Sequence, residues 1–210
     1  MSEETFKRIL SSIIIIPIAL FFIIKGSFFF IFFMSIFFVV TAYEWYQMTK
    51  KKFYLYPGIF FLLLSTYSAY LFRNDSNIEA NILFLIVILI CVSTDIGGYI
   101  FGKIFKGPKL TKISPNKTYA GMFGGFFLSI ISVNIFINYA ELINYRIDAE
   151  FTHIVFILVL LISFVSQIGD LVVSYFKRIS KIKNTGKILP GHGGLLDRVD
   201  GLIFAIPFSY

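Results

Sequence analysis

Long apolar segments separated by short polar stretches run along the whole chain. A helix needs about 20 mainly apolar residues to cross the hydrocarbon core of a bilayer, and several segments approach or exceed that length. They are Ile9–Ile24, Ser27–Tyr46, Tyr54–Phe72, Ile78–Phe101, Thr118–Tyr139 and Thr152–Phe176. A further apolar segment begins near Gly201 and stops at Tyr210, which is too short to cross alone. The pattern predicts an all-α, polytopic integral membrane protein with about seven transmembrane helices, the last one partial.

Composition supports a membrane protein and excludes a soluble one. The 210 residues are 57% hydrophobic and only 15% charged, with a mean hydropathy of +0.81. Soluble domains carry about 25% charged residues. No linker or soluble insertion interrupts the pattern, so we expect one transmembrane domain over 1–210, with N-terminal helices at 9–72 and a catalytic part at 78–210. Cys91 is the only cysteine, which excludes a disulfide within the chain.

The positive charges lie on one side of the predicted topology. If the N-terminus faces the cytoplasm, all but three of the 19 Lys and Arg fall in cytoplasmic loops, and the exceptions are Lys25, Arg73 and Arg146. An excess of Lys and Arg in cytoplasmic loops is the usual determinant of orientation. The net charge of +7 is therefore explained by a cytoplasmic rim and does not indicate nucleic acid. We expect a multi-pass protein of the cell (inner) membrane, with a cytoplasmic N-terminus and a cytoplasmic-facing polar site.

Three carboxylates interrupt the apolar segments. Asp95 and Asp170 each lie one to two turns inside the predicted cytoplasmic boundary, whereas Glu44 stands beside Trp45 and Tyr46 at the end of a segment. A carboxylate inside a span costs about 2.5 kcal/mol or more, so it usually faces a cavity, a partner or an ion. Asp95 and Asp170 therefore indicate a polar pocket, with a structural bond to a neighbouring helix as the alternative. For Glu44 we expect a solvated anchor at the interface.

The most polar stretch runs from residue 174 to residue 200 and reads SYFKRISKIKNTGKILPGHGGLLDRVD. Cations, loop glycines and two carboxylates three residues apart are poor material for a hydrophobic core. Glycines let backbone N–H groups approach an anion, cations neutralise it, and paired carboxylates can share a metal. The alternative is a basic loop that only sets topology. Topology, however, requires neither PGHGG nor DRVD.

A second polar stretch, FGKIFKGPKLTKISPNKTYAGMFGG at 101–125, contains KISPNKT at 112–118 and leads into a predicted helix. Hydroxyl, amide and ammonium groups near a helix start can bind a phosphate. A plain N-cap with a solvated lysine is the alternative. The glycines that follow, Gly121, Gly124 and Gly125, fit helix packing as well as they fit a functional role.

The motif at 174–200 resembles the C-terminal motif of phosphatidate cytidylyltransferases (CDP-diacylglycerol synthases). That motif reads, in outline, S-x-x-K-R-x4-K-D-x-G-x3-P-G-H-G-G-x-x-D-R-x-D. The chain departs from it at Asn184, where the family usually has Asp, so we assign that position no role. The sequence GDL around Asp170 and the KISPNKT stretch also resemble family elements, although Ala120 stands where the family often has Glu. The resemblance covers roughly 95–201.

The resemblance implies transfer of cytidylyl from CTP to phosphatidic acid in phospholipid biosynthesis, giving CDP-diacylglycerol and pyrophosphate with Mg²⁺ as cofactor. It implies the catalytic residues Asp170, Asp197, Lys177, Arg178, His192 and Arg198. It implies the substrate-binding residues Ser114, Asn116, Lys117, Thr118, Gly191, Gly193 and Gly194. The expected metal ligands are Asp170 and Asp197, with Asp200 as a weaker candidate and Asp95 making an adjacent polar contact. The implied partners are CTP, phosphatidic acid and the lipid bilayer.

Two other functions fit parts of the pattern. A membrane lipid or polyprenol kinase would share the substrate type but would move only the γ-phosphate. An ion-coupled transporter would show paired halves with broken helices near the midplane, whereas the polar residues here gather on one side. The spacing DGxxAR followed by GxxxDxxxD, typical of CDP-alcohol phosphotransferases, does not occur. The sequence leaves open a homodimer and a second, monovalent cation.

Overall fold

The computed structural model describes residues 17–50, 52–74, 78–111, 113–142, 152–186, 188 and 193–210, without the side chains of 78–80 and 141–142. Its helices are α2 (Ser27–Thr49), α3 (Leu55–Asn74), α4 (Ile78–Phe105), α5 (Tyr119–Leu142), α6 (His153–Ile179), α7 (Leu196–Val199) and α8 (Leu202–Ser209). Residues 17–25 are also helical and precede Gly26. No β-strand forms in these ranges; one isolated bridge joins Lys109 to Thr118.

Within the described residues, five helices are long and apolar enough to cross a membrane, namely α2, α3, α4, α5 and α6. They match the middle five predicted segments, so the polytopic all-α fold is confirmed. The first predicted segment lies partly outside the described residues, and its described part is helical. The last predicted segment forms α8, which has only 8 residues. The expectation of a short final helix agrees with the structure.

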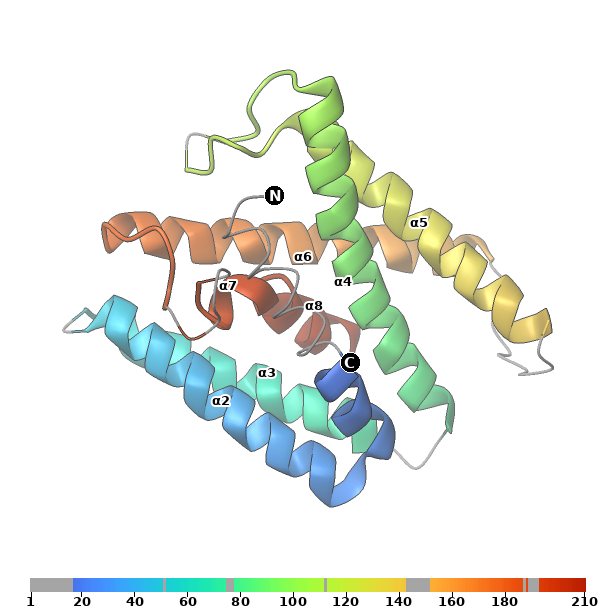
Figure 1. The fold of residues 1–210 in the computed structure, drawn as a ribbon, viewed down its shortest axis with the longest axis horizontal. Helices are drawn as coiled ribbons and strands as arrows, with labels where there is room; N and C mark the ends of the chain where they lie inside the picture. Colours follow the sequence, from blue (N-terminus) through green and yellow to red (C-terminus); the bar gives the residue numbers. More distant parts are fainter. Residues whose placement is uncertain are drawn as a thin grey trace.

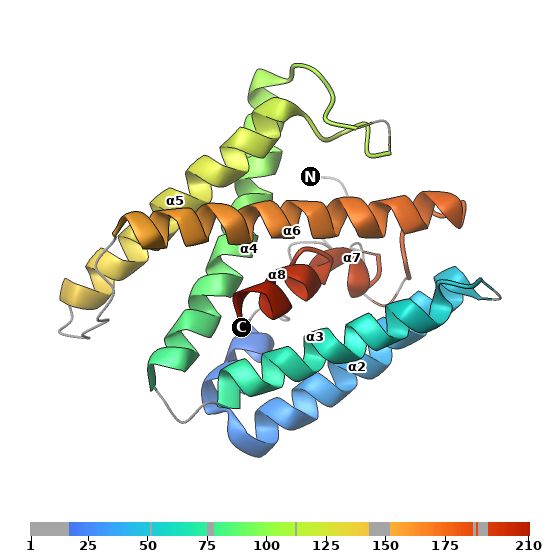
Figure 2. The same ribbon diagram turned by 180° about the vertical axis from the view of Figure 1, so that it is seen from behind.

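The helices form two hairpins and a crossing helix. The α2–α3 hairpin and the α4–α5 pair lie on opposite sides, and α6 crosses behind α4 and α5 (Figure 1). The short helices α7 and α8 fill the space between α6 and α3, as the view from behind also shows (Figure 2). This arrangement buries Ile203, Ala205 and Ile206 of α8 inside the helix bundle.

The α4–α5 crossing depends on glycines. A Cβ added at Gly97 would lie 2.3 Å from the carbonyl oxygen of Gly124, and one at Gly121 would lie 2.7 Å from the carbonyl oxygen of Gly98. A Cβ at Gly125 would meet the Thr94 carbonyl oxygen at 3.0 Å. Small residues let the backbones of membrane helices approach this closely. Of the two roles left open by the sequence, helix packing is therefore the one that the geometry supports for these glycines.

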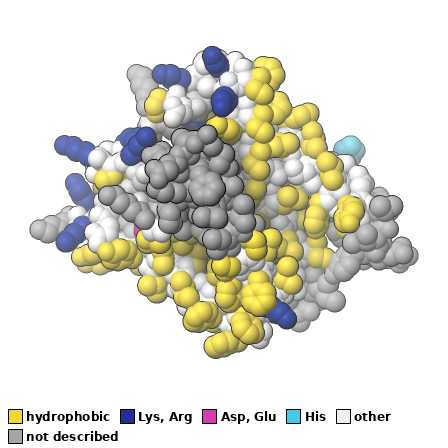
Figure 3. Space-filling model, viewed as in Figure 1, with side chains coloured by type: hydrophobic (Ala, Val, Ile, Leu, Met, Phe, Trp, Pro, Cys, Tyr) yellow, Lys and Arg dark blue, Asp and Glu magenta, His cyan; other side chains and the backbone are white. Residues whose placement is uncertain are grey.

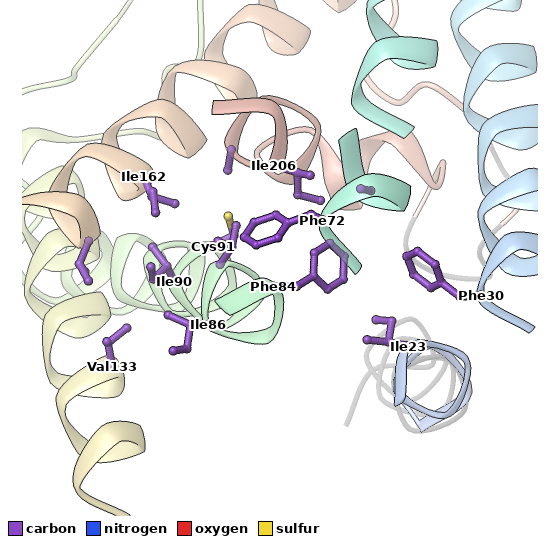
Figure 4. Packing of buried hydrophobic residues seen from close by; sticks show 14 of the residues in the cluster. Ile23, Phe30, Phe72, Phe84, Ile86, Ile90, Cys91, Val133, Ile162 and Ile206 are labelled. Atoms are coloured by element: carbon purple, nitrogen blue, oxygen red, sulfur yellow. The ribbon is translucent and has the colours of Figure 1, made fainter. Parts of the chain in front are cut away.

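An apolar core joins the two hairpins at the level of Phe84 (Figure 4). The Phe84 ring meets those of Phe30 and Phe72 edge to face, with ring centroids 5.9 Å and 5.7 Å apart. Around them lie Ile23, Ile90 and the buried Cys91. Many aromatic and aliphatic side chains point outward instead, which suits helices whose outer solvent is lipid.

The basic loops gather at one end of the bundle. The α2–α3 turn and the C-terminal end of α6 lie at the left of Figure 1 and the α4–α5 loop lies at its top left, while the C-terminal ends of α3 and α5 lie toward the lower right. Most Lys and Arg side chains on the visible face of the space-filling view also lie toward the upper left (Figure 3). The fold therefore brings together the loops that the charge pattern assigned to one side.

Candidate active site

A polar cavity of about 310 Å³ opens between α4, α5, α6 and the α4–α5 loop. Its lining residues are Thr94, Asp95, Gly98, Tyr99, Leu110, Ser114, Asn116, Lys117, Thr118, Gly121, Met122, Gln167 and Asp170. The predicted wall of Ser114, Asn116, Lys117 and Thr118 thus faces Asp95 and Asp170 across one cavity. The sequence predicted both groups, and the structure brings them together.

Lys117 and Asp170 form an ion pair at the rim of this cavity. The Lys117 ammonium contacts Asp170 Oδ2, and the side chains are 27% and 26% exposed, so water reaches both. Asp170 Oδ1 also accepts a hydrogen bond from the Ser174 hydroxyl at 3.3 Å. A cation and a carboxylate meet here at a place open to solvent, where an anionic ligand could engage the lysine.

Backbone hydrogen bonds hold together the α4–α5 loop that carries Lys117. The Leu110 N–H donates to the Lys117 carbonyl at 2.8 Å, and the Lys117 N–H donates to the Ser114 carbonyl at 3.0 Å. Thr118 Oγ1 accepts the Gly121 N–H at 3.1 Å and so caps the start of α5. The N-cap that the sequence left open is therefore present at Thr118. These bonds fix the loop so that Lys117 reaches Asp170.

Asp197 lies on α7 and is held by three donors. Lys177 Nζ donates to Oδ1 at 2.8 Å, while the N–H groups of Thr185 and Gly194 donate to Oδ2 at 2.8 Å and 3.1 Å. The Lys177 ammonium also lies 3.9 Å from Asp200 Oδ2. One buried lysine thus stands between the two carboxylates that the sequence expected to share a metal.

Asp200 lies between α7 and α8, outside the spanning helices, and is 7% exposed. Burial raises the pKa of Asp200 well above its ordinary value; the nearby Asp170 carboxylate raises it further, and Lys177 opposes the shift. Its Oδ1 accepts the Gly201 N–H at 3.1 Å. Asp200 is therefore electrostatically linked to both the cavity and the Lys177 pair.

The acids and bases in and beside the cavity form one connected group in which carboxyl groups outnumber cations. Its carboxylates are Asp95, Asp170, Asp197 and Asp200, and its cations are Lys117, Lys177 and Arg198. Among the described residues, no three His, Cys, Asp or Glu side chains converge into a complete metal site. Mg²⁺ commonly takes one or two carboxylates and fills its remaining positions with water and substrate phosphates. The donor set fits that mode of binding.

The other predicted site residues are placed as follows. Arg178 is exposed and its Nε donates to the Ile113 carbonyl at 3.3 Å, which ties the end of α6 to the α4–α5 loop. Arg198 follows Asp197 on α7. The predictions for Gly191 and His192 lie outside the described residues.

Gly193 and Gly194 allow the loop to approach two carboxylates. Gly193 has φ of +93°, where a side chain is strained. A Cβ at Gly194 would lie 2.1 Å from Thr185 Oγ1 and 2.5 Å from Glu44 Oε2. Their substrate-binding role stays a prediction, while close packing of this loop explains why glycine is needed.

The expectation for Glu44 was wrong. Its side chain is 2% exposed and accepts hydrogen bonds from residues near the C-terminus, so it is no solvated anchor. Sequence alone does not distinguish the two cases, because an acid at the end of a span has the same local sequence whether it is hydrated or bonded to a distant loop. Gln167 was also missed: it lines the cavity one turn before Asp170, and its position beside GDL was the available signal.

Comparison with known proteins shows which family the chain resembles. The model of the "Cytidylyltransferase family" matches residues 6–80 and 59–210. A phosphatidate cytidylyltransferase of Rickettsia felis is 33% identical over an alignment of 217 positions, gaps included, which covers 99% of this chain and 92% of that protein. One of Brucella suis is 40% identical over 155 residues, or 73% of this chain, and one of Staphylococcus aureus is 39% identical over 166 residues, or 76%.

The matched region is only part of some of these relatives. It covers 54% of the Brucella suis protein and 60% of the Staphylococcus aureus protein, so the chain spans little more than half the length of these relatives. The family model nevertheless matches nearly the whole chain, including both polar stretches. On this match, and on the similarity to the Rickettsia felis protein over almost its whole length, this chain belongs to the cytidylyltransferase family.

Proposed function

We propose that the protein transfers cytidylyl from CTP to phosphatidic acid, giving CDP-diacylglycerol and pyrophosphate. The observation that carries this proposal is the polar cavity in which Lys117 faces Asp95 and Asp170, set among membrane-spanning helices. A cavity between such helices, at the end where the basic loops gather, suits one substrate from water and one from lipid. The matched relatives named phosphatidate cytidylyltransferase support the choice of reaction.

The proposed reaction joins two anions. A phosphate oxygen of phosphatidic acid attacks the α-phosphorus of CTP, a new P–O bond forms, and the bond to the β-phosphate oxygen breaks to release pyrophosphate. The attacking phosphate is already ionised near neutral pH, so no strong general base is needed. Catalysis then depends on positioning and on neutralising charge, for which Lys117 and Lys177 are the best placed cations.

We propose that Mg²⁺ takes part, held by Asp170 together with the triphosphate. The excess of carboxylates over cations around the cavity supports this, because like charges this close repel and a divalent cation removes that repulsion. When bound, Mg²⁺ would supply positive charge that offsets the negative charge on the phosphate oxygens of CTP and of the leaving pyrophosphate. Asp197 becomes a second ligand only if Lys177 moves from its Oδ1, and Asp200 is the weaker candidate.

The remaining predicted residues take supporting roles in this proposal. Arg178, His192 and Arg198 neutralise phosphates, and the backbone at 191–194 lies against them. Ser114, Asn116 and Thr118 form the wall that faces the nucleotide. The gathered basic loops support an orientation with the N-terminus and the site in the cytoplasm.

The deciding experiment is an assay of the detergent-solubilised protein with phosphatidic acid and CTP labelled at the α- or γ-phosphate. We expect label from α-labelled CTP to appear in the lipid, together with pyrophosphate. Transfer of the γ-label instead would identify a kinase. Absence of both products from folded protein would refute the proposal.

A further inference from the structure

Glu44 connects the α2–α3 hairpin to the loop that leads from α6 to α7. It lies near the end of α2, and its carboxylate accepts the Thr185 hydroxyl at 2.9 Å, the Leu195 N–H at 2.9 Å and the Leu196 N–H at 2.8 Å. Two of the donors lie in the segment between α6 and α7, and the third, Leu196, is the first residue of α7; all three are 141 to 152 residues further along the chain. A carboxylate buried to 2% exposure is costly unless such bonds compensate it. Glu44 is thus committed to this loop.

The same loop is held from its other side by Asp197. Thr185 takes part in both contacts, because its N–H donates to Asp197 and its hydroxyl donates to Glu44. Gly194 donates to Asp197, and the next two N–H groups along the chain donate to Glu44. The two ends of the loop are therefore clamped between two carboxylates from different helices.

The fit around Glu44 is tight. A Cβ at Gly186 would lie 2.7 Å from Glu44 Oε1, so the loop backbone passes directly over the carboxylate. The neighbouring Trp45 packs edge to face on Phe176 of α6 with ring centroids 5.1 Å apart, and its Nε1 donates to the Leu55 carbonyl at 3.2 Å. These contacts fix the end of α2 against α6, so the position of Glu44 is defined by packing as well as by hydrogen bonds.

We infer that Glu44 is a positioning residue of the active site. By holding Thr185, Leu195 and Leu196 it sets the position of Asp197, and through Asp197 that of the Lys177 ammonium. The inference rests on the proposed function, and it gives the α2–α3 hairpin a part in catalysis beyond anchoring in the membrane. Glu44 does not line the polar cavity, so it acts through the loop rather than on the substrates.

The first test measures turnover per folded molecule. Glu44→Gln keeps the size of the side chain but replaces one acceptor oxygen with an NH₂ donor. The side chain then faces three donors with only one acceptor oxygen, so part of its hydrogen bonding to the loop is lost. We expect kcat to fall about 10- to 100-fold, the loss typical of a misplacement near 1 Å, with a smaller change in KM for CTP. Thr185→Val should lose activity in the same way, and Thr185→Ser, which keeps the hydroxyl, should retain more. Gln47→Ala, on the exposed face of α2, is the matched control and should behave as the wild type.

The second test needs no activity. Limited trypsin digestion at the exposed Lys181 and Lys183 reports whether the loop is held. We expect faster cleavage there in Glu44→Gln and Thr185→Val than in the wild type or Gln47→Ala. If the wild type makes no CDP-lipid, the proposed function fails, and this digestion still decides whether Glu44 clamps the loop.

Three results would overturn the inference. One is a kcat per folded molecule within twofold of the wild type in Glu44→Gln, with only the folded fraction reduced, since that marks a purely structural role. Another is unchanged trypsin cleavage in both loop-opening variants. The third result is equal turnover of Thr185→Val and Thr185→Ser. This comparison also serves as the test if Glu44→Gln does not fold.

Discussion

The Lys177–Asp197 pair offers a sharp test of the site's electrostatics. Both side chains are about one-tenth exposed (11% and 10%), and the ammonium lies 2.8 Å from Asp197 Oδ1 and 3.9 Å from Asp200 Oδ2. Lys177→Met keeps the length and packing of the side chain but leaves two buried carboxylates without their shared cation. Removing one partner of a buried pair typically costs about 3–5 kcal/mol, so we expect a loss of that order in the free energy of unfolding.

A double-mutant cycle with Asp197→Asn separates the charge effect from simple loss of packing. Asp197→Asn alone leaves Lys177 beside Asp200, so it should cost less, about 1–3 kcal/mol. The double variant no longer buries the Asp197 charge, and its destabilisation should fall short of the sum of the two single effects by about 1 kcal/mol or more.

The free energies would be measured by denaturant-induced unfolding in detergent micelles, followed by near-UV circular dichroism. Lys181→Met is the matched control, because Lys181 is exposed and its replacement should change stability by less than about 0.5 kcal/mol. Strict additivity of the two substitutions, or a Lys177→Met variant as stable as the control, would refute the view that Lys177 compensates these carboxylates.

Three further predictions test the site, the topology and the packing. Asp170→Asn should lose nearly all activity while still inserting in the membrane, because losing a metal ligand should raise the activation free energy by several kcal/mol. A variant with a tenth or more of the wild-type rate, or a wild type fully active in EDTA, would contradict metal ligation by Asp170. Cysteines placed at Lys109 and Lys183 should react only with reagent on the cytoplasmic side, and labelling of either from outside intact cells would break the topology. Gly97→Ala should lower the free energy of unfolding by about 1–3 kcal/mol, because the added Cβ would overlap the Gly124 carbonyl. Gly98→Ala is the control, because the atom nearest to a Cβ there lies at an ordinary distance of 3.7 Å. Equal melting temperatures for the two variants would argue against the close crossing of α4 and α5.

Local sequence signals account for much of the structure. Span length and apolar character sufficed to predict α2 through α6, because in a bilayer each helix must satisfy its own backbone hydrogen bonds. Asp170 and Lys117 were likewise marked by local context, one as an acid inside a span and the other as a cation at a helix start. Their meeting in one cavity follows from the packing of α4, α5 and α6.

What the sequence could not predict depends on contacts between distant segments. The spacing of Asp197 and Asp200 suggested a shared metal, but it carried no information on Lys177, which reaches between them from another helix. Glu44 was misjudged for the same reason, since its donors lie more than 140 residues away. Charge and burial at these positions are set by tertiary packing, which pattern and propensity do not encode.

The long separation between Glu44 and its loop bears on biosynthesis. A chain emerging from the ribosome inserts its spanning helices in order, and the end of α2 is in place long before residues 194–196 are made. A chain stalled after α6 would hold the spanning helices α2 to α6 and yet leave the Glu44 carboxylate without its three donors. Membrane insertion of α2 to α6 and formation of the Glu44 hydrogen bonds are therefore separate events, and the second requires residues up to Leu196 to have been translated.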